Sequence, residues 1–276
     1  MTNDEYTALP GIRASELKHG RKSMGHMRAA VLGELPKSTP ALRFGRLFHG
    51  AVLEPDIFAN KAVVWRGGRR GTKAYEAFLM ENGGDEEWVL DQDEFSALLR
   101  MGTSVHANTE AHRLIEGTTH EVTLSWTDKL YGAAKCRMDG YHDGIGLLEV
   151  KSAADVGARR ADGRYDGTRF FSAFARMGYD LQLGWYAEGL AAHGMPVSNV
   201  SLIAVEKSSP YSVVVLDVPG HIVESGRKEA VELARAYRCC EAAGHWPGVA
   251  EGRQVLELPE WASEKVDDSG IEEVQA

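Results

Sequence analysis

Two carboxylates and a lysine lie close together in the middle of the sequence. Asp139 is followed ten residues later by the triplet Glu149-Val150-Lys151. On an extended strand, Glu149 and Lys151 point to one face and Val150 to the other. Asp143-Gly144 is a hairpin signal between them. We therefore expect Asp139 and Glu149 to lie side by side on neighbouring strands.

This arrangement suits metal-dependent hydrolysis. Two carboxylates so close together repel each other unless a cation lies between them. A hard divalent cation such as Mg²⁺ takes oxygen ligands, and the backbone carbonyl of Val150 would add another. Lys151 could orient or help deprotonate a water molecule, or balance charge on a phosphate. These are the requirements of phosphodiester hydrolysis, with Mg²⁺ as the expected cofactor and Mn²⁺ as an alternative.

The pattern has a simpler interpretation, because Glu and Lys on an exposed strand face commonly form a weak surface pair. The preceding residues favour the active site. Leu147 and Leu148 predict a mainly buried strand that ends in charge, and buried strands rarely end in two ionisable groups without a function.

Four further residues are candidates for the same site. Gln182 and Tyr186 are four apart on an expected helix, so they face the same way, either beside the scissile phosphate or on a half-buried helix face. His49 lies in an apolar helix and is either a core residue or a ligand. Glu121 begins a strand and is either a third carboxylate or a solvated strand end.

The periodicity of the sequence predicts the elements that must position these side chains. Short helices are expected in the first forty residues, and longer ones over 41–53, 73–81, 91–116, 179–193 and 222–243. Strands are expected over 121–126, 131–141, 145–151, 200–206 and 212–218, with a polar stretch over 152–168. This order predicts an α/β fold with a central mixed β-sheet flanked by helices.

Composition limits the class of protein. The net charge of −9, from 31 basic and 40 acidic residues, argues against a protein that coats DNA, but not against an enzyme that grips it at one site. Three cysteines make a disulfide framework improbable and cannot hold a four-cysteine iron–sulfur cluster. With no secretory signal and no apolar run near the roughly 20 residues that span a bilayer, we expect a cytoplasmic protein without a membrane partner.

Two segments gather positive charge. The first is a glycine-rich loop and the second is the polar stretch after the Glu-Val-Lys triplet; their basic residues are Arg66, Arg69, Arg70 and Lys73, and Arg159, Arg160, Arg164 and Arg169. Each segment either contacts the DNA backbone or is a solvated loop.

A series of short blocks follows one order along the sequence: Asn3 to Tyr6, Pro10-Gly-Ile12, Ser15 to Leu17, Leu42 to His49, Val52-Leu-Glu-Pro55, His120-Glu121, Cys136 to Asp139, Glu149-Val150-Lys151, Tyr179 to Tyr186, Trp246-Pro247 and Leu256 to Trp261. Together these blocks resemble the RecE (exonuclease VIII) nuclease domain, a branch of the PD-(D/E)XK nuclease superfamily, along nearly the full length. Single blocks are weak signals, but so many in one order form a strong one. The resemblance implies one domain over 1–276, with a helical part at 1–117, a nuclease core at 118–246 and a tail at 247–276.

The resemblance also implies roles and partners. The metal site would involve His49, Glu121, Asp139 and Glu149, with Lys151 as the catalytic lysine and Gln182 and Tyr186 beside it. RecE-like enzymes degrade linear double-stranded DNA from 5′ ends and leave 3′ single-stranded tails for an annealing protein of the RecT type. A ring-forming homo-oligomer is implied as well. Two features depart from the family: Glu149 stands where Asp is usual, and the segment 153–176 is longer.

Two other functions remain open at this point. One is an end-processing nuclease of the RecB or CRISPR-associated type, although these often carry a cysteine-held cluster. The other is a non-catalytic DNA-end-binding protein with a nuclease fold. The intact set of Asp139, Glu149 and Lys151 argues against the second, because a non-catalytic relative is free to lose those charges.

Overall fold

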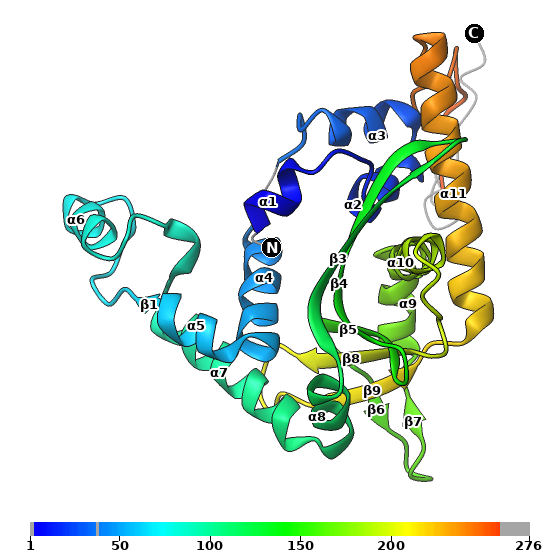
Figure 1. Cartoon of the computed structure of the whole chain (residues 1–276). Helices are drawn as coiled ribbons and strands as arrows, with labels where there is room; N and C mark the ends of the chain where they lie inside the picture. The colour runs from blue at the N-terminus through cyan, green and yellow to red at the C-terminus, as the bar shows by residue number, and fades with distance from the viewer. Residues whose placement is uncertain (1–2, 37–38, 260–276) are drawn as a thin grey trace, which may run out of the picture.

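A five-stranded mixed sheet forms the centre of the protein (Figure 1), seen in a computed structural model that describes residues 3–36 and 39–259. Its order is β3-β4-β5-β8-β9, with β5 and β8 parallel and the other neighbours antiparallel. The strands are β3 (Thr119–Asp128), β4 (Gly132–His142), β5 (Gly146–Ala153), β8 (Val200–Glu206) and β9 (Val213–Asp217). The mixed α/β sheet and its five strands are as the sequence predicts.

Helices cover both faces of the sheet (Figure 1). On one face lie α2 (Ala14–Gly20), α3 (Met24–Val31), α10 (Tyr179–Ala192) and α11 (Gly220–Ala243), and on the other α4 (Pro40–Leu53), α7 (Gln92–Ala107) and α8 (Thr109–Glu116). Successive β5 residues divide between the cores, since Leu147 belongs to the first and Leu148 and Val150 to the second. Helix α10 is apolar on nearly all sides because it is enclosed between the sheet and α11.

Strands β4 and β5 separate at the candidate carboxylates. Their pairing runs only from His142–Gly146 to Gly140–Leu148, whereas β4 continues along β3 as far as Gly132. Beyond the point where β5 separates, the edge of β4 is paired with Ile12, which follows α1 (Asn3–Ala8). The Ile12 N–H donates to the Ala133 carbonyl at 3.0 Å, and the Lys135 N–H donates to the Ile12 carbonyl at 2.9 Å. The N-terminal segment thereby brings α2 against the opened sheet.

Gly11 makes this close approach feasible. Its φ of +117° is a backbone conformation that other residues rarely adopt. A Cβ atom at this position would lie 2.6 Å from the backbone nitrogen of Ala134, so only glycine lets the segment reach β4.

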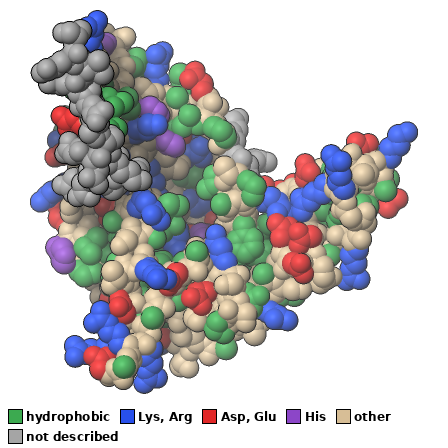
Figure 2. Space-filling view, turned by 180° about the vertical axis from the view of Figure 1, so that it is seen from behind, with side chains coloured by type: hydrophobic (Ala, Val, Ile, Leu, Met, Phe, Trp, Pro, Cys, Tyr) green, Lys and Arg blue, Asp and Glu red, His purple; other side chains and the backbone are tan. Residues whose placement is uncertain are grey.

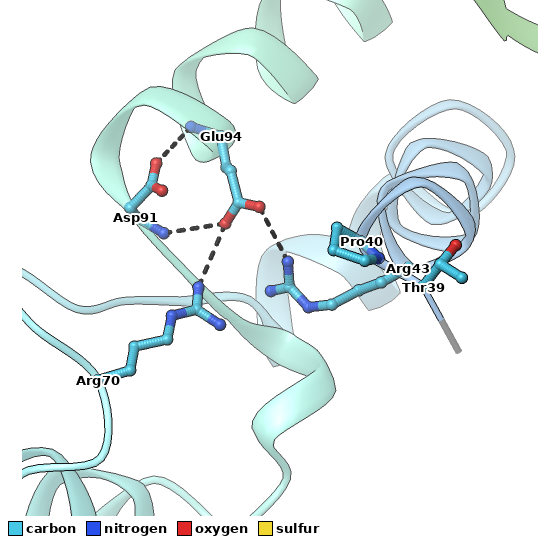
Figure 3. Close-up of a pocket in the computed structure, with 6 residues that line it drawn as sticks. All are labelled: Thr39, Pro40, Arg43, Arg70, Asp91 and Glu94. Atoms are coloured by element: carbon cyan, nitrogen blue, oxygen red, sulfur yellow. Dashed lines mark hydrogen bonds and ion pairs between the residues drawn. The ribbon is translucent and has the colours of Figure 1, made fainter. Parts of the chain in front are cut away.

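An arm, residues 55–90, extends from the body of the molecule (Figure 1). It contains α5 (Pro55–Lys61), β1 (Val63–Val64), α6 (Lys73–Glu81), a short 3₁₀ turn (Glu86–Trp88) and β2 (Val89–Leu90). Glu94 ties its base to the body, because its carboxylate accepts from Arg43 at 3.0 Å and from Arg70 at 3.3 Å (Figure 3). These residues line an open cavity of about 400 Å³, which includes the predicted DNA contact Arg70 but none of the candidate catalytic or metal-binding residues.

Two expected elements are wrong in detail. The helix expected over 91–116 is two helices, because the Asn108 side chain accepts the Ala111 N–H and starts α8 as a new helix. The polar stretch expected over 152–168 contains the hairpin of β6 (Ala158–Arg159) and β7 (Tyr165–Asp166), and it leads into α9 (Thr168–Arg176), a helix that was not predicted. Phe170 of α9 is buried against the sheet, and the Asp166 carboxylate just before the helix accepts the Thr168 N–H at 3.1 Å.

Three observations concern the chain as a whole. Within residues 3–36 and 39–259, no helix is long and apolar enough to cross a membrane. All three cysteines are free thiols. The tail expected from 247 is described as far as 259, and its remainder lies outside the described residues.

Contact between two glycines fixes the position of α10, and this gives a stability prediction. A Cβ on Gly184 would lie 2.1 Å from the Arg227 nitrogen, and one on Gly226 would lie 2.1 Å from the Asp180 carbonyl oxygen. Gly184→Ala must therefore push α10 and α11 apart, and we expect it to lower the free energy of unfolding by about 3 kcal/mol. The matched control is Gly45→Ala in α4, where an added Cβ meets nothing within 4 Å; it should stabilise the protein by up to about 1 kcal/mol. Urea unfolding checks both, and equal effects would contradict the packing argument.

Candidate active site

Asp139 lies where β4 and β5 separate, and both of its carboxylate oxygens are held. Oδ2 accepts the backbone N–H of Val150 at 2.7 Å, and Oδ1 lies 3.1 Å from Nδ1 of His49 on α4. The side chain is buried. The contact to Val150 replaces a strand-to-strand hydrogen bond with a side-chain one, so the gap in the sheet and the position of the carboxylate depend on each other.

Glu149 is fully buried beside Asp139 on β5. Its Oε1 accepts from Lys151 Nζ and from Gln182 Nε2, the latter at 2.5 Å. Its Oε2 is buried with no hydrogen-bond partner among the described residues. A partnerless oxygen on a buried carboxylate is costly, and a bound cation would satisfy it.

Glu121 completes a group of three candidate ligands. It stands on β3 between the pairs His120–Gly140 and Val122–Met138, and thus opposite Asp139. One ligating atom each from His49, Glu121 and Asp139 can be chosen so that all three lie within 4.8 Å of one another. Glu121 has a φ of +53°, a strained conformation for a non-glycine residue of the kind that clusters at functional sites.

The donor set fits a divalent cation. Carboxylate oxygens suit Mg²⁺ and Mn²⁺, and the imidazole nitrogen of His49 favours the softer transition ions over Mg²⁺. Glu149 is not in the tight group of three, but its partnerless Oε2 makes it a further candidate ligand. The N–H of Val150 donates to the Asp139 carboxylate. The backbone carbonyl of Val150 remains a predicted ligand.

The site's electrostatics follow from burial and mutual charge. Burial and the charge of Asp139 raise the pKa of Glu149 to about 7. Burial acts in the same direction on Asp139, but His49 and Lys151 outweigh it and lower its pKa. For Lys151, burial would lower the pKa, but the charges of Glu149 and Asp139 raise it. Lys151 is therefore charged at neutral pH.

Helix α10 supplies the polar groups predicted beside the carboxylates. Gln182 Nε2 donates to Glu149 and also to the Tyr186 hydroxyl at 2.8 Å. Burial and the charge of Glu149 hold the pKa of Tyr186 well above its ordinary value, so this hydroxyl stays neutral. The sequence-predicted residues on α4, β3, β4, β5 and α10 thus meet in one place.

Three other residues border the site and were not among its predicted members. Arg137 forms an ion pair with Glu121; its position two residues before Asp139 could have revealed it. Tyr179 lies under two lysines, with Lys151 Nζ 5.2 Å and Lys18 Nζ 5.0 Å from its ring centroid. Lys18 comes from α2, and no spacing in the sequence connects it with the carboxylates.

The two basic segments lie away from the carboxylates. Figure 2 shows Lys and Arg side chains along the arm and again around the β6–β7 hairpin. All eight predicted DNA contacts except Arg70 are exposed. Arg70 is held by Glu94 and the Val89 carbonyl. In the hairpin segment, ion pairs join Arg160 to Asp166, Arg164 to Asp162 and Arg169 to Asp155.

Known proteins share this fold. It is similar to that of a "Putative exonuclease" from Eubacterium rectale, with a TM-score of 0.59 and 14% identity over 96% of this chain and 97% of that one. A phage-related exonuclease from Haemophilus somnus 129PT matches at a TM-score of 0.34 and 12% identity, over 87% of this chain and 99% of that one, which is too weak to carry an argument. No curated protein matches.

The fold and the acidic site define the class of protein, a metal-dependent nuclease of the PD-(D/E)XK type. Residues 14–259 match the model of one family, and the chain belongs to it: the PDDEXK-like domain of unknown function (DUF3799).

The raised pKa of Glu149 predicts how cation binding depends on pH. Because binding requires the carboxylate, a cation must displace a proton below pH 7. Protonation of His49, whose pKa Asp139 raises against the effect of burial, acts in the same direction. We expect Mn²⁺ affinity to fall about tenfold or more per pH unit below 7 and to level off above it.

Isothermal titration between pH 6 and 8 measures this dependence. Glu149→Gln should bind Mn²⁺ more weakly and with a shallower dependence on pH. His112→Gln, which changes a half-buried histidine on α8 that pairs with Glu116 and is not a candidate ligand, serves as the control and should behave like the wild type. A wild-type affinity that is constant over this range would contradict the assignment of Glu149.

Proposed function

We propose that the protein is an exodeoxyribonuclease that requires Mg²⁺, or Mn²⁺ in its place, and degrades linear double-stranded DNA from its 5′ ends. The observation that carries the proposal is the buried pair of carboxylates at the opening between β4 and β5. Asp139 lies within ligand range of His49 and Glu121, and Glu149 holds a partnerless oxygen next to a charged lysine. No structural role accounts for so many buried charges in one place.

Each residue of the site has a separate role in the proposed hydrolysis. When bound, a divalent cation activates water and offsets charge on the scissile phosphate. In our proposal His49, Glu121, Asp139 and Glu149 hold it, with the Val150 carbonyl as a further ligand. The raised pKa of Lys151 makes this side chain a donor, which suits charge stabilisation at the phosphate better than removal of a proton from water.

Gln182 and Tyr186 orient the Glu149 carboxylate in this scheme. The exposed Arg and Lys residues of the arm and hairpin would contact the DNA backbone, with Arg70 held less freely than the rest. Such local basic surfaces would let a protein with a net charge of −9 hold phosphates.

The finer part of the proposal rests on the resemblance to RecE-like exonucleases. It comprises 5′ polarity, the production of 3′ single-stranded tails for recombination, an annealing partner of the RecT type, and assembly of the chain into a homo-oligomeric ring. It is supported by the ordered blocks from Pro10 to Trp246 that resemble that family.

Degradation of DNA of different forms tests the proposed activity. Purified protein should convert linear duplex DNA to single strands and short products only when Mg²⁺ or Mn²⁺ is present, and should leave closed circular duplex intact. A label on the 5′ ends should be released before a label on the 3′ ends. Nicking of the circles would indicate an endonuclease, and retardation of linear DNA without degradation would indicate an end-binding protein.

Substitution of Lys151 separates chemistry from binding. Lys151→Ala removes the ammonium but no proposed ligand, so we expect hydrolysis to fall by about 10³-fold while Mn²⁺ and DNA still bind. Asp139→Ala should lose cation binding as well. The control is Lys129→Ala in the exposed turn between β3 and β4, which should cleave like the wild type. Wild-type cleavage by Lys151→Ala would refute the proposed role.

A further inference from the structure

Lys18 reaches the candidate active site from the N-terminal helix α2. Its Nζ donates to Oε1 of Gln182 at 2.7 Å, and Gln182 in turn donates from Nε2 to Glu149 and Tyr186. The position of α2 is fixed on both sides of Lys18. Ile12, which precedes Lys18 in the chain, pairs with β4. Arg21, which follows Lys18, donates to the Asp180 carboxylate of α10 at 2.8 Å.

The hydrogen-bonding capacity of Lys18, Gln182 and Glu149 determines which group donates and which accepts in this chain of bonds. A lysine ammonium has donors only, whereas an amide has one accepting and one donating end. Lys18 therefore fixes the oxygen end of Gln182 toward itself and leaves the NH₂ end for Glu149. In the opposite orientation, the amide oxygen of Gln182 would face the Glu149 carboxylate, and the two acceptors would repel each other.

The orientation of Gln182 decides which oxygen of Glu149 is left for a ligand. Gln182 and Lys151 both bond Oε1, while Oε2 stays buried and without a partner among the described residues. Without a donor from Gln182, Glu149 would lose one of the two contacts that hold Oε1 and would be free to turn.

Keeping a lysine in this place has a cost. Burial and the nearby charge of Lys151 lower the pKa of Lys18 to about 7, so the ammonium that donates to Gln182 is kept there at a cost in free energy. A methionine at this half-buried position would fill similar space without that cost, and the bond from Lys18 to Gln182 is what a methionine would lose.

We propose that Lys18 is a positioning residue of this nuclease, which orients the Gln182 amide so that Glu149 presents its Oε2 to the divalent cation. This inference deepens the proposed function and rests on it. Lys18 acts through Gln182 and does not itself contact the cation or the scissile phosphate.

Cation affinity tests the proposal independently of catalysis. Lys18→Met removes the donor, and we expect Mn²⁺ binding measured by calorimetry to weaken about tenfold, the lower end of the effect of losing a residue that orients a metal ligand. Lys18→Arg keeps a donor and should restore most of the affinity. Lys22→Met, the same change at an exposed lysine just after α2, is the control and should bind as the wild type does. Thermal melting verifies that each variant is folded.

A double-mutant cycle with Gln182→Met separates positioning from direct contact. If Lys18 acts through Gln182, then adding Lys18→Met to Gln182→Met costs no further Mn²⁺ affinity and no further activity. Additive losses, or a loss of DNA affinity with unchanged Mn²⁺ affinity, would overturn the proposal and make Lys18 a phosphate contact. If Lys18→Met fails to fold, the Mn²⁺ affinities of Lys18→Arg and Gln182→Met are compared instead. The proposal then requires that Lys18→Arg keeps an Mn²⁺ affinity that Gln182→Met loses.

The two proposals fail differently. If the wild type binds Mn²⁺ but degrades no DNA, the proposed function is wrong, and the Mn²⁺ affinities of the variants still decide whether Lys18 positions Glu149. If the wild type degrades DNA and Lys18→Met binds Mn²⁺ with unchanged affinity, only the role of Lys18 is wrong.

Discussion

Repulsion between two buried carboxylates is the constraint on which this structure depends. Asp139 and Glu149 are both withdrawn from water, and each raises the cost of ionising the other. The surroundings offset that cost with positive charge and donors. His49 and Lys151 lower the pKa of Asp139 against the effect of burial, and Lys151 and Gln182 bond one oxygen of Glu149. The remaining imbalance is what a divalent cation would neutralise.

The opening of the sheet is the geometric counterpart of that constraint. Two fully paired strands would leave no room for a cation between the carboxylates, so β4 and β5 separate next to Gly140 and Leu148. Separation exposes backbone groups that need partners. The Asp139 side chain meets one of them, and the segment at Ile12 pairs with the freed edge of β4. The N-terminal region is therefore part of the sheet from which the site is built.

Much of this could be predicted from the sequence because its signals are local. Alternation over 121–126, apolar runs and turn signals located all five central strands, and the Asp143-Gly144 turn brought Asp139 beside the Glu149 strand. The misplaced elements depend on single side chains, such as Asn108, which ends one helix and begins another. Lys18 could not be found in this way, because its contact with Gln182 spans 164 residues and no spacing rule covers contacts made only through tertiary packing.

The docking of Ile12 on β4 has a consequence for how the protein matures. Ala134 lies far along the chain from Ile12, so this segment can dock on β4 only after the middle of the chain has been made. No contiguous fragment contains both Lys18 and Tyr186 without most of the sheet. The candidate site therefore cannot assemble in a growing chain until Tyr186 and the strands β3, β4 and β5 that precede it have been made.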